Sequence, residues 1–329
     1  MLYRTEELAA LIAEGRPMLI AGAAEQMRLL PRGNWIGGTT PFILGAKGGL
    51  QVSDMLFASV MPRQARIASI QRYGVGGLHL LPEDMPENGF SVVIMPAGTL
   101  VQQTFAKEAP SYPGIFSKAL SGWVSGSRAG HFGGRPQVFF GPSALCMEDE
   151  AVAIHLELPP GLRASVEMIN VYEPRPAPVI RFPSEGFTTT HAIVDGELVV
   201  FAEYLNRIKA NIEVPLLANY GGTRINVGIR GYDLPHGQVS FYGPVFRNVN
   251  YHFAQPVPNM KQKIMDFMPK DGRSPVFSCV CISNYTQGMM EDFPAGAFEG
   301  PVAFGEIAHL LVNQTMTYLR IVNEDGTDI

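Results

Sequence analysis

The strongest constraint on the fold lies in residues 274–322, where three apolar, β-rich segments follow one another. Successive side chains of a strand point to opposite faces, so polar residues inside such segments gather along one face of a sheet. The polar residues capable of chemistry in this stretch are Ser278, Cys279, Cys281, Asn284, Glu306, His309, Asn313, Gln314 and Thr315. We therefore expect this part of the chain to form strands that line a binding site.

The composition favours a globular protein and argues against nucleic-acid and membrane partners. The chain has 329 residues, which indicates two domains or one large one, and its 46% apolar and 17% charged residues allow a large core. The formal net charge of −5 argues against nucleic acid, which attracts basic surfaces. The sequence has no run of five Lys and Arg residues, so we also expect no anionic membrane partner.

The termini and the cysteines predict a cytoplasmic location. The first residues lack the charged and apolar regions of a signal peptide, and no apolar stretch reaches the roughly 18 residues of a membrane span. The three cysteines, Cys146, Cys279 and Cys281, cannot form a disulfide framework. We expect them to be reduced thiols.

Two parts of the sequence echo each other. Gly37-Gly38-Thr39 is matched by Gly221-Gly222-Thr223, and Gln51-Val-Ser is matched by Gln238-Val-Ser. A proline-rich connector at residues 174–183 is the expected boundary. We predict an α+β protein of two related α/β halves, residues 1–175 and 176–329, with mixed, largely antiparallel sheets packed centrally and helices outside.

The glycine pairs are candidate pocket walls. Glycine lets the backbone approach a ligand and expose its amides, and a following threonine adds a hydroxyl donor. On this interpretation Gly38, Thr39, Gly222 and Thr223 line the pocket. The alternative is a bulge or tight turn with a purely structural purpose.

Glu306 is the candidate for binding a ligand cation. It follows Phe304-Gly305 inside an apolar stretch, and a buried carboxylate requires hydrogen bonds or a cationic partner. That partner is either a ligand ammonium group or Arg224, in which case the pair only holds strands together. Asn313 and Thr315 alternate onto one face of a strand and are expected to hydrogen-bond the ligand, with Cys279 and Asn284 as further walls of the pocket.

An enzymatic alternative rests on Cys279. A cysteine nucleophile needs a base such as His309, with Glu306 to orient that base. The simpler interpretation is a buried cysteine that packs as a small apolar residue. No cysteine or histidine spacing matches a zinc pattern, and no nucleotide-binding fingerprint is present, so we predict neither a metal nor a cofactor.

A loop rich in Gly and Ser spans residues 121–134. It is either a lid that carries Trp123, Arg128 and His131 to a site or a surface insertion.

Three segments together resemble the C-terminal signature of FIST proteins, which are intracellular sensory modules. They are Val276-Phe-Ser-Cys, Gly300 through Gly305-Glu-Ile-Ala, and Asn313-Gln-Thr. The region Ile36-Gly-Gly-Thr-Thr is compatible with the N-terminal FIST half, and the helix expected from Glu197 resembles the family's connection between halves. The chain departs from the family after Cys279, where Val280-Cys-Ile replaces a glycine and a basic residue.

The resemblance implies a FIST N-like half in residues 1–175 and a FIST C-like half in residues 176–329. It further implies a stand-alone sensor for an amino acid or related metabolite, which would signal through a partner protein or a second copy of itself. We therefore predict a cytoplasmic ligand-binding sensory protein and not an enzyme. The alternatives are a hydrolase or transferase using Cys279 and His309, and a structural or assembly subunit without a ligand.

Overall fold

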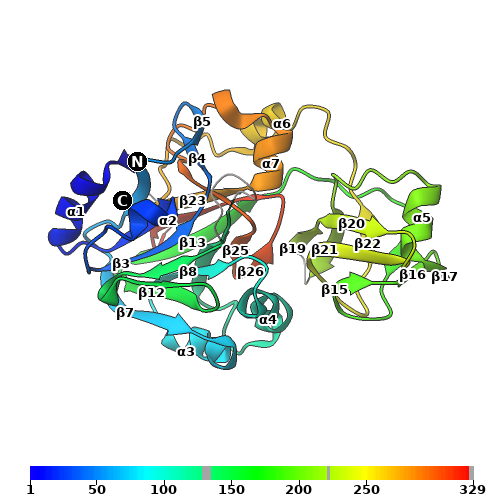
Figure 1. Ribbon diagram of the computed structural model, residues 1–329, viewed down its shortest axis with the longest axis horizontal. Helices are drawn as coiled ribbons and strands as arrows, with labels where there is room; N and C mark the ends of the chain where they lie inside the picture. Colours follow the sequence, from blue (N-terminus) through cyan, green and yellow to red (C-terminus); the bar gives the residue numbers. More distant parts are fainter. Residues whose placement is uncertain (128–134, 221–222, 326–329) are drawn as a thin grey trace. The chain divides into compact units, whose positions relative to one another are not determined.

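The computed structural model describes residues 1–329 except 128–134, 221–222 and 326–329, and it divides into two compact units (Figure 1). The first unit contains residues 1–169, 268–310 and 316–329, and the second contains residues 170–267 and 311–315. The first crossing of the chain between the units, after residue 169, lies close to the predicted boundary. The predicted second half differs from either unit, because residues 268–310 return to the first one.

The first unit is built from three repeats of one pattern of strands and helices. The elements of the first repeat are β1 (Leu2–Tyr3), α1 (Thr5–Ala13), β2 (Met18–Gly22), α2 (Ala24–Met27), β3 (Trp35–Thr39), β4 (Phe42–Gly45), β5 (Gly48–Gln51) and β6 (Leu56–Val60). Those of the second are β7 (Arg66–Tyr73), α3 (Leu81–Asp84), β8 (Gly89–Pro96), α4 (Leu100–Glu108), β9 (Ala119–Ser125), β10 (Val138–Phe140), β11 (Leu145–Met147) and β12 (Ala151–Glu157). Those of the third are β13 (Leu162–Ile169), β23 (Phe277–Cys281), α7 (Ile282–Gln287), β24 (Gly300–Ala303), β25 (Glu306–Ala308) and β27 (Met316–Asn323). Between β25 and β27 lies β26 (Leu310–Val312), of which Leu310 belongs to the first unit and residues 311–312 to the second.

Each repeat has a β-α-β crossover at its centre. The parallel pairs are β2 with β3, β8 with β9, and β23 with β24, joined through α2, α4 and α7 respectively. The strands of these pairs are almost wholly buried along their length, which explains their continuous apolar sequences. Helix α4 begins where the Thr99 hydroxyl accepts a hydrogen bond from the backbone N–H of Gln102.

The three repeats exchange strands in a cycle. The strand after each crossover pairs with a strand of a neighbouring repeat. These pairs are β4 with β24, β10 with β3, and β25 with β9. The last strand of each repeat returns to its own crossover, so β6, β12 and β27 pair with β2, β8 and β23. The resulting sheets have the orders β1-β6-β2-β3-β10-β11, β7-β12-β8-β9-β25-β26 and β13-β27-β23-β24-β4-β5.

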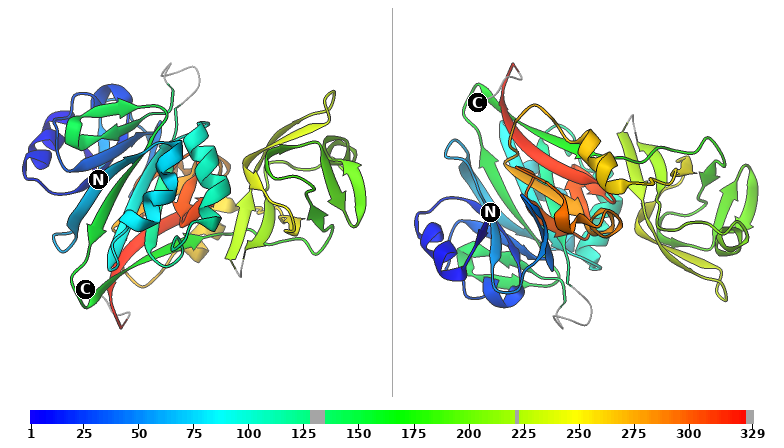
Figure 2. Two further views of the ribbon diagram at one scale, coloured as in Figure 1. Left: turned by 90° about the horizontal axis from the view of Figure 1, so that it is seen from below. Right: turned by 90° about the horizontal axis from the view of Figure 1, so that it is seen from above.

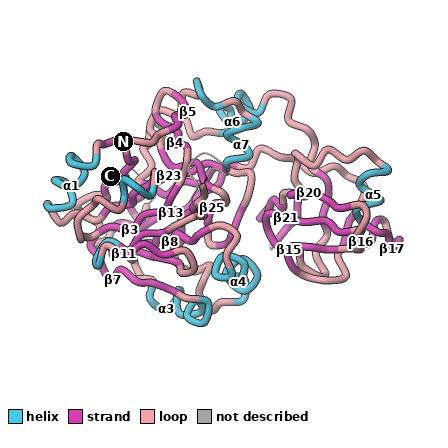
Figure 3. Tube along the Cα trace, in the orientation of Figure 1, coloured by secondary structure: helices cyan, strands magenta, loops and turns pink. Residues whose placement is uncertain are grey.

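Helices lie on the outside of the strands in the first unit, as Figure 3 shows for α1, α3 and α4. The outermost strands face solvent on one side, and β13, green in Figure 2, lies antiparallel to the red β27. The core contains Trp123 stacked on Phe277, with ring centroids 5.3 Å apart, and both side chains are buried together with Ile94. The predicted α+β class with mixed sheets is confirmed.

The second unit is built from hairpins. Its elements are β14 (Ile180–Arg181), β15 (Gly186–Thr189), β16 (His191–Val194), β17 (Glu197–Val200), α5 (Phe201–Arg207), β18 (Leu216–Tyr220), β19 (Thr223–Val227), β20 (Ile229–Asp233), β21 (Gln238–Val245), β22 (Tyr251–Phe253) and α6 (Met260–Phe267). The strand orders are β17-β16-β14-β22-β18-β19 and β15-β21-β20. Phe182 centres its core through edge-on ring contacts with Phe201, Phe241 and Tyr251.

The repetition in the structure differs from the predicted duplication. Thr39 ends a strand of a parallel pair, whereas Thr223 begins the second strand of the antiparallel β18–β19 hairpin. The two threonines therefore stand in different connections. The three crossovers share a pairing pattern that the sequence does not display.

Across the described ranges, every helix is too short or too polar to cross a membrane.

Candidate functional site

The ends of parallel strands from two repeats meet at one cavity of the first unit. Strands β2 and β3 end at Gly22 and Thr39, and β9 ends at Ser125. The backbone N–H of Gly126 donates to the carbonyl of Thr39 at 2.8 Å, which brings the end of β9 to the end of β3. Ligands of α/β sheets commonly bind outside the carboxyl ends of parallel strands, so this position is the candidate site.

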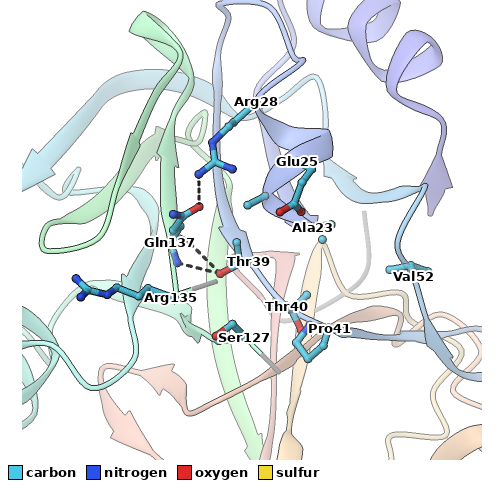
Figure 4. Close-up of a pocket in the computed structure, with 13 residues that line it drawn as sticks. Ala23, Glu25, Arg28, Thr39, Thr40, Pro41, Val52, Ser127, Arg135 and Gln137 are labelled. Carbon is cyan, nitrogen blue, oxygen red and sulfur yellow. Dashed lines mark hydrogen bonds between the residues drawn. The ribbon is translucent and has the colours of Figure 1, made fainter. Parts of the chain in front are cut away.

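The cavity has a volume of about 90 Å³ and is shown in Figure 4. It is lined by Gly22, Ala23, Ala24, Glu25, Arg28, Thr39, Thr40, Pro41, Val52, Gly126, Ser127, Arg135 and Gln137. Ala23, Ala24, Pro41 and Val52 supply apolar walls, and the other side chains supply charge and hydrogen-bonding groups. Apolar walls with a few convergent polar groups are typical of small-molecule sites.

Short helix α2 places two opposite charges at the rim. Glu25 lies in its first turn, and Arg28 follows its last residue, so the two are three positions apart on one face. In Figure 4 the Arg28 side chain reaches toward Gln137, and Glu25 points into the same space. Both residues are exposed, so a ligand in the cavity can contact the guanidinium and the carboxylate.

Gln137 holds the back of the cavity in a fixed arrangement. Its side-chain oxygen accepts from Arg28 Nη2 at 2.8 Å, and its side-chain nitrogen donates to Glu148 at 2.8 Å. Its backbone N–H donates to the Thr39 hydroxyl oxygen at 2.9 Å. Glu148 also forms an ion pair with Arg135 at 3.5 Å, and in Figure 4 Arg135 extends away from Thr39. Arg28 is therefore the cation that faces the cavity.

Of the residues predicted from the sequence, Thr39 lines this cavity and Gly38 lies directly beside it in β3. A Cβ atom built at Gly38 would lie 2.6 Å from Ile94 Cγ2 and 3.0 Å from Trp123 Nε1. Glycine is thus required for close packing of β3 on the core, which agrees with the structural alternative for this residue. Gly222 lies outside the described residues, and Thr223 is exposed on β19.

Glu306 and Cys279 lie in the interior of the first unit. Glu306 is fully buried on β25 opposite Trp123 of β9. The Cys279 thiol lies 3.1 Å from the Thr317 hydroxyl and 3.5 Å from the carbonyl oxygen of Gly122. Burial, with a smaller effect of the Glu306 carboxylate, raises the pKa of this thiol well above its usual range. Cys279 is therefore held as the neutral thiol.

His309 has other neighbours. Its Nδ1 lies 3.2 Å from the carbonyl oxygen of Ile115, and its ring is tilted against Phe116. Burial lowers the pKa of this imidazole, so it is a weaker base than a free histidine. A reactive cysteine requires a thiolate, which a cationic neighbour stabilises. The described charged neighbour that acts on Cys279 is the Glu306 carboxylate, which disfavours the thiolate.

Arg224 forms its ion pair with Glu173, at 2.9 Å, and also donates to the carbonyl of Tyr172. This arrangement within the second unit differs from the predicted pairing of Arg224 with Glu306. The partner comes from the segment before β14, which lies only a few residues after the chain enters the second unit.

Asn313 belongs to the five-residue segment 311–315 of the second unit. The side-chain N–H₂ of Asn226 donates to the carbonyls of Asn313 and Gln314, at 3.0 and 3.2 Å. The Gln314 side chain donates to the carbonyl of Glu213 at 2.7 Å. The predicted ligand-binding segment is thus fixed by hydrogen bonds of its backbone and side chains, and Thr315 is fully buried.

Two further predictions concern Asn284 and the Gly-rich loop. Asn284 is buried in α7, and it is not among the residues that line the cavity of Figure 4. Trp123, predicted as part of a lid, is instead a core residue of β9. Arg128 and His131 lie outside the described residues.

Sequence reasoning missed Arg28, Glu25 and Gln137. The available signal was the short helical segment between the glycine-ended strand at residues 18–22 and the strand that ends in Thr39. That order of elements is typical of a β-α-β crossover, whose strand ends form sites. Gln137 gave no signal, because its position depends on the pairing of β10 with a different repeat.

A protein-family model described as "Family of unknown function (DUF6976)" matches residues 3–322. The match covers almost the whole sequence, and the chain belongs to this family. A comparison with curated proteins found no match. The description of the family names no ligand or activity, so the geometry of the cavity carries the functional argument.

Proposed function

We propose that this chain is a small-ligand-binding protein whose site is the cavity at the ends of β2, β3 and β9. The observation that carries the proposal is the pair of opposite charges, Arg28 and Glu25, at the rim of an apolar-walled cavity. A guanidinium binds a carboxylate through two parallel hydrogen bonds, and a carboxylate binds an ammonium group. A ligand that carries both groups satisfies both residues.

The volume limits the size of the ligand. The cavity, at about 90 Å³, is smaller than the range of about 300–1,000 Å³ that is usual for the sites of drug-sized molecules. The proposed ligand is therefore small, such as a small amino acid. This ligand class agrees with the sensory interpretation that the resemblance to FIST proteins implied. On that interpretation the protein is cytoplasmic and signals through a partner protein or a second copy.

The experiment is a thermal-shift screen of the full chain against amino acids, the corresponding amines and the corresponding carboxylic acids. A ligand that binds only the folded state stabilises it by about 2.7 kcal/mol at a hundredfold excess over its Kd. We expect small amino acids to raise the Tm more than either one-charge analogue.

Matched variants locate the site. Arg28→Gln removes the guanidinium, and we expect affinity to fall about 10- to 100-fold, as for a lost hydrogen bond to a charged group. Arg32→Gln makes the same charge change at an exposed residue outside the cavity and should leave affinity unchanged. Equal effects of the two substitutions would place the ligand elsewhere. Glu306→Gln tests the predicted role of Glu306 in the same assay. If Glu306 contacts the ligand ammonium group, the substitution should weaken the binding of amino acids more than that of the carboxylic acids, which lack this group.

A further inference from the structure

Strand β13 gives the first unit a long open backbone edge. It is the last strand of its sheet, with β27 on one side of it (Figure 2). Each of its eight residues pairs with a residue of β27, without a bulge. Among the residues that the structure describes, no strand lies along its other edge. A long, regular edge of this kind is a template for pairing with a further strand, so it indicates an interaction surface.

The strands at the other ends of the same three sheets are protected against such pairing. Strands β1, β5, β11 and β26 have only two to four residues. Strand β7 has eight, but the single step from His155 to Leu156 of β12 corresponds to two steps of β7, from Ser69 to Ile67, which makes Ala68 a bulge. Short strands and bulges are the means by which native proteins keep edges apart. Strand β13 has neither, and it contains no proline.

Alternate residues of β13 direct their backbone groups at the open edge. The backbone N–H of Glu324 donates to the carbonyl of Gly161, which extends the β13–β27 ladder by one hydrogen-bonded pair. Hydrogen-bonded pairs alternate with non-bonded pairs in an antiparallel ladder, so the odd-numbered residues of β13 bond to β27. The N–H and C=O groups of Ala164, Val166 and Met168 therefore point to the other side. Across the described residues, these groups have no backbone partner there.

The side chains of β13 follow the same alternation. Arg163, Ser165 and Glu167 lie on one face, where the two charged side chains are exposed. Ala164 and Val166 lie on the opposite face and pack, half-buried, against the core of the first unit. A strand that pairs with this edge must therefore offer charged groups on one face and apolar groups on the other.

A second copy of β13 meets both requirements. Arg163 and Glu167 lie two residues before and two residues after Ser165. Two copies related by a two-fold axis at Ser165 run antiparallel, and each Arg163 then lies opposite Glu167 of the other copy. The same register places Ala164 opposite Val166 on the apolar face. An axis moved by one residue in either direction loses both charge pairs, so the charges select this register.

The Glu167 carboxylate is already held in place on its own strand. It accepts a hydrogen bond from the Tyr318 hydroxyl at 2.6 Å and one from the Ser165 hydroxyl at 3.3 Å. An ionised carboxylate has about four acceptor positions, so two neutral donors leave room for a guanidinium. Arg163 of a second copy would thus meet a carboxylate that is both oriented and exposed.

We propose that this edge is a homodimer interface, in which β13 pairs antiparallel with β13 of a second copy about a two-fold axis at Ser165. The two copies then share one continuous sheet across the axis. This inference names the partner that the proposed function left open, but it does not depend on the ligand of the cavity. The experiments below contain no ligand, so their failure leaves the proposal for the cavity standing.

The first test is sedimentation velocity of the full chain over about 1–500 µM, because a single strand from each copy makes a small interface of moderate affinity. We expect a concentration-dependent dimer. A monomer over the whole range would overturn the proposal.

Charge reversal tests the register. Arg163→Glu and Glu167→Arg each place like charges opposite one another at both ends of the paired strands, and each should raise the dimer Kd about 10-fold or more. An equimolar mixture of the two variants restores opposite charges in a heterodimer, so it should associate more tightly than either variant alone. The Tm of each variant reports that it is folded. A mixture that associates no better than its components would overturn the register.

The matched control is Arg66→Glu on the bulged strand β7. It makes the same charge change at another exposed edge residue and should leave the dimer Kd unchanged. An effect equal to that of Arg163→Glu would assign the loss to net charge and overturn the proposal.

Two further variants test the backbone pairing and the axis. Val166→Pro removes an N–H that faces the open edge and leaves the ladder to β27 complete, so it should yield a folded monomer. Ser165→Cys places two thiols on the axis in a non-hydrogen-bonded pair, with Cα atoms about 4.5 Å apart, which a disulfide can bridge. We expect a cross-linked dimer under mild oxidation and none in the natural chain. A dimer that survives Val166→Pro, or that Ser165→Cys does not cross-link, would place the interface elsewhere.

Discussion

The two units of this chain use different strand connections. The first unit contains three parallel pairs joined by helical crossovers, whereas the strand pairs described in the second unit are antiparallel. A crossover returns each strand in the same direction, so that carboxyl ends gather on one side, as Gly22, Thr39 and Ser125 do. In the hairpins of the second unit, buried polar residues such as Asn226 instead donate hydrogen bonds to backbone carbonyls. Connection type therefore separates polar residues that line a cavity from those that secure the fold.

The largest expected effects come from removing one core aromatic residue in each unit. Trp123→Ala in the first unit and Phe182→Ala in the second should each lower the free energy of unfolding by about 3–5 kcal/mol. The chain has two tryptophans, Trp35 and Trp123, both in the first unit, so Trp35 fluorescence reports on that unit alone. Urea denaturation followed by fluorescence reports the unfolding of the first unit, and circular dichroism reports the unfolding of both. We expect Trp123→Ala to shift the fluorescence midpoint and Phe182→Ala to shift a transition seen by circular dichroism. If Phe182→Ala shifts the Trp35 transition as much as Trp123→Ala does, the units unfold together.

Low pH should destabilise the first unit through His155. This residue is fully buried, with Nε2 2.9 Å from the Tyr73 hydroxyl and Nδ1 2.8 Å from the Ser91 hydroxyl. The Tyr73 hydroxyl donates to Asp84, so its oxygen accepts from Nε2–H, and the neutral imidazole is the form that fits. Burial lowers the pKa of His155 from 6.5 to about 4 and outweighs the opposing effect of the Asp84 carboxylate.

Between pH 6.5 and pH 4 the unfolded chain binds the proton and the folded chain does not, so stability falls as the pH falls. The expected loss is about 3 kcal/mol over this interval, at about 1.4 kcal/mol per pH unit. Urea midpoints measured by Trp fluorescence give this slope directly. His155→Gln should remove the contribution, and an unchanged slope in that variant would assign the pH dependence to other groups.

An added methyl group at Gly38 should disturb the first unit beside its cavity. Gly38→Ala places a Cβ against Ile94 and Trp123, and overpacking of this kind costs about 1–3 kcal/mol. Gly76 is the control, because a Cβ there meets nothing within 4 Å. Gly76→Ala should remain within about 1 kcal/mol of the natural chain. Thermal unfolding of both variants checks the difference, and equal Tm values would mean that β3 can move away from the core.

The smallest effects should separate the two threonines of the Gly-Gly-Thr segments. Thr39 is buried and its hydroxyl exchanges hydrogen bonds with the backbone of Gln137, so Thr39→Ala should cost about 0.5–1.5 kcal/mol. Thr223 is exposed, and Thr223→Ala should stay within about 0.5 kcal/mol. The comparison needs precise urea midpoints. A larger loss for Thr223 would show that this second segment has a role that its exposure does not indicate.

The sequence predicted the class of the fold and some of the cavity, but not the repetition. Buried strands such as residues 277–281 were recognisable from their apolar composition, and Thr39 was a candidate from its glycine neighbours. The three crossovers share the direction and the pairing of their strands but not their amino acids. Comparing the three segments of the sequence therefore does not reveal them. The Gly-Gly-Thr sequence does occur twice, but Thr39 lies in a parallel pair of strands and Thr223 in an antiparallel hairpin.

The candidate site was harder to predict for a related reason. Arg28 and Gln137 come together only because β10 pairs with a strand of the preceding repeat. Their separation of more than a hundred residues gives no local signal. Glu306 and Cys279, by contrast, were correctly placed in an apolar, β-rich region, where polar residues are conspicuous. The burial that comes with such a region raises the pKa of the Cys279 thiol.

The cyclic exchange of β4, β10 and β25 has a consequence for how this chain could change over time. Each repeat lends a strand to one neighbour and receives one from the other, so the ring closes only with three members, as in an oligomer with three-fold symmetry. In a trimer of identical chains, every substitution appears in all three copies. Here each repeat has its own sequence. The first repeat can therefore carry Arg28 and Glu25 beside a cavity, while the third repeat carries the second unit as an insertion between its strands. Joining the three repeats in one chain thus allows each repeat to acquire its own chemistry without disturbing the other two.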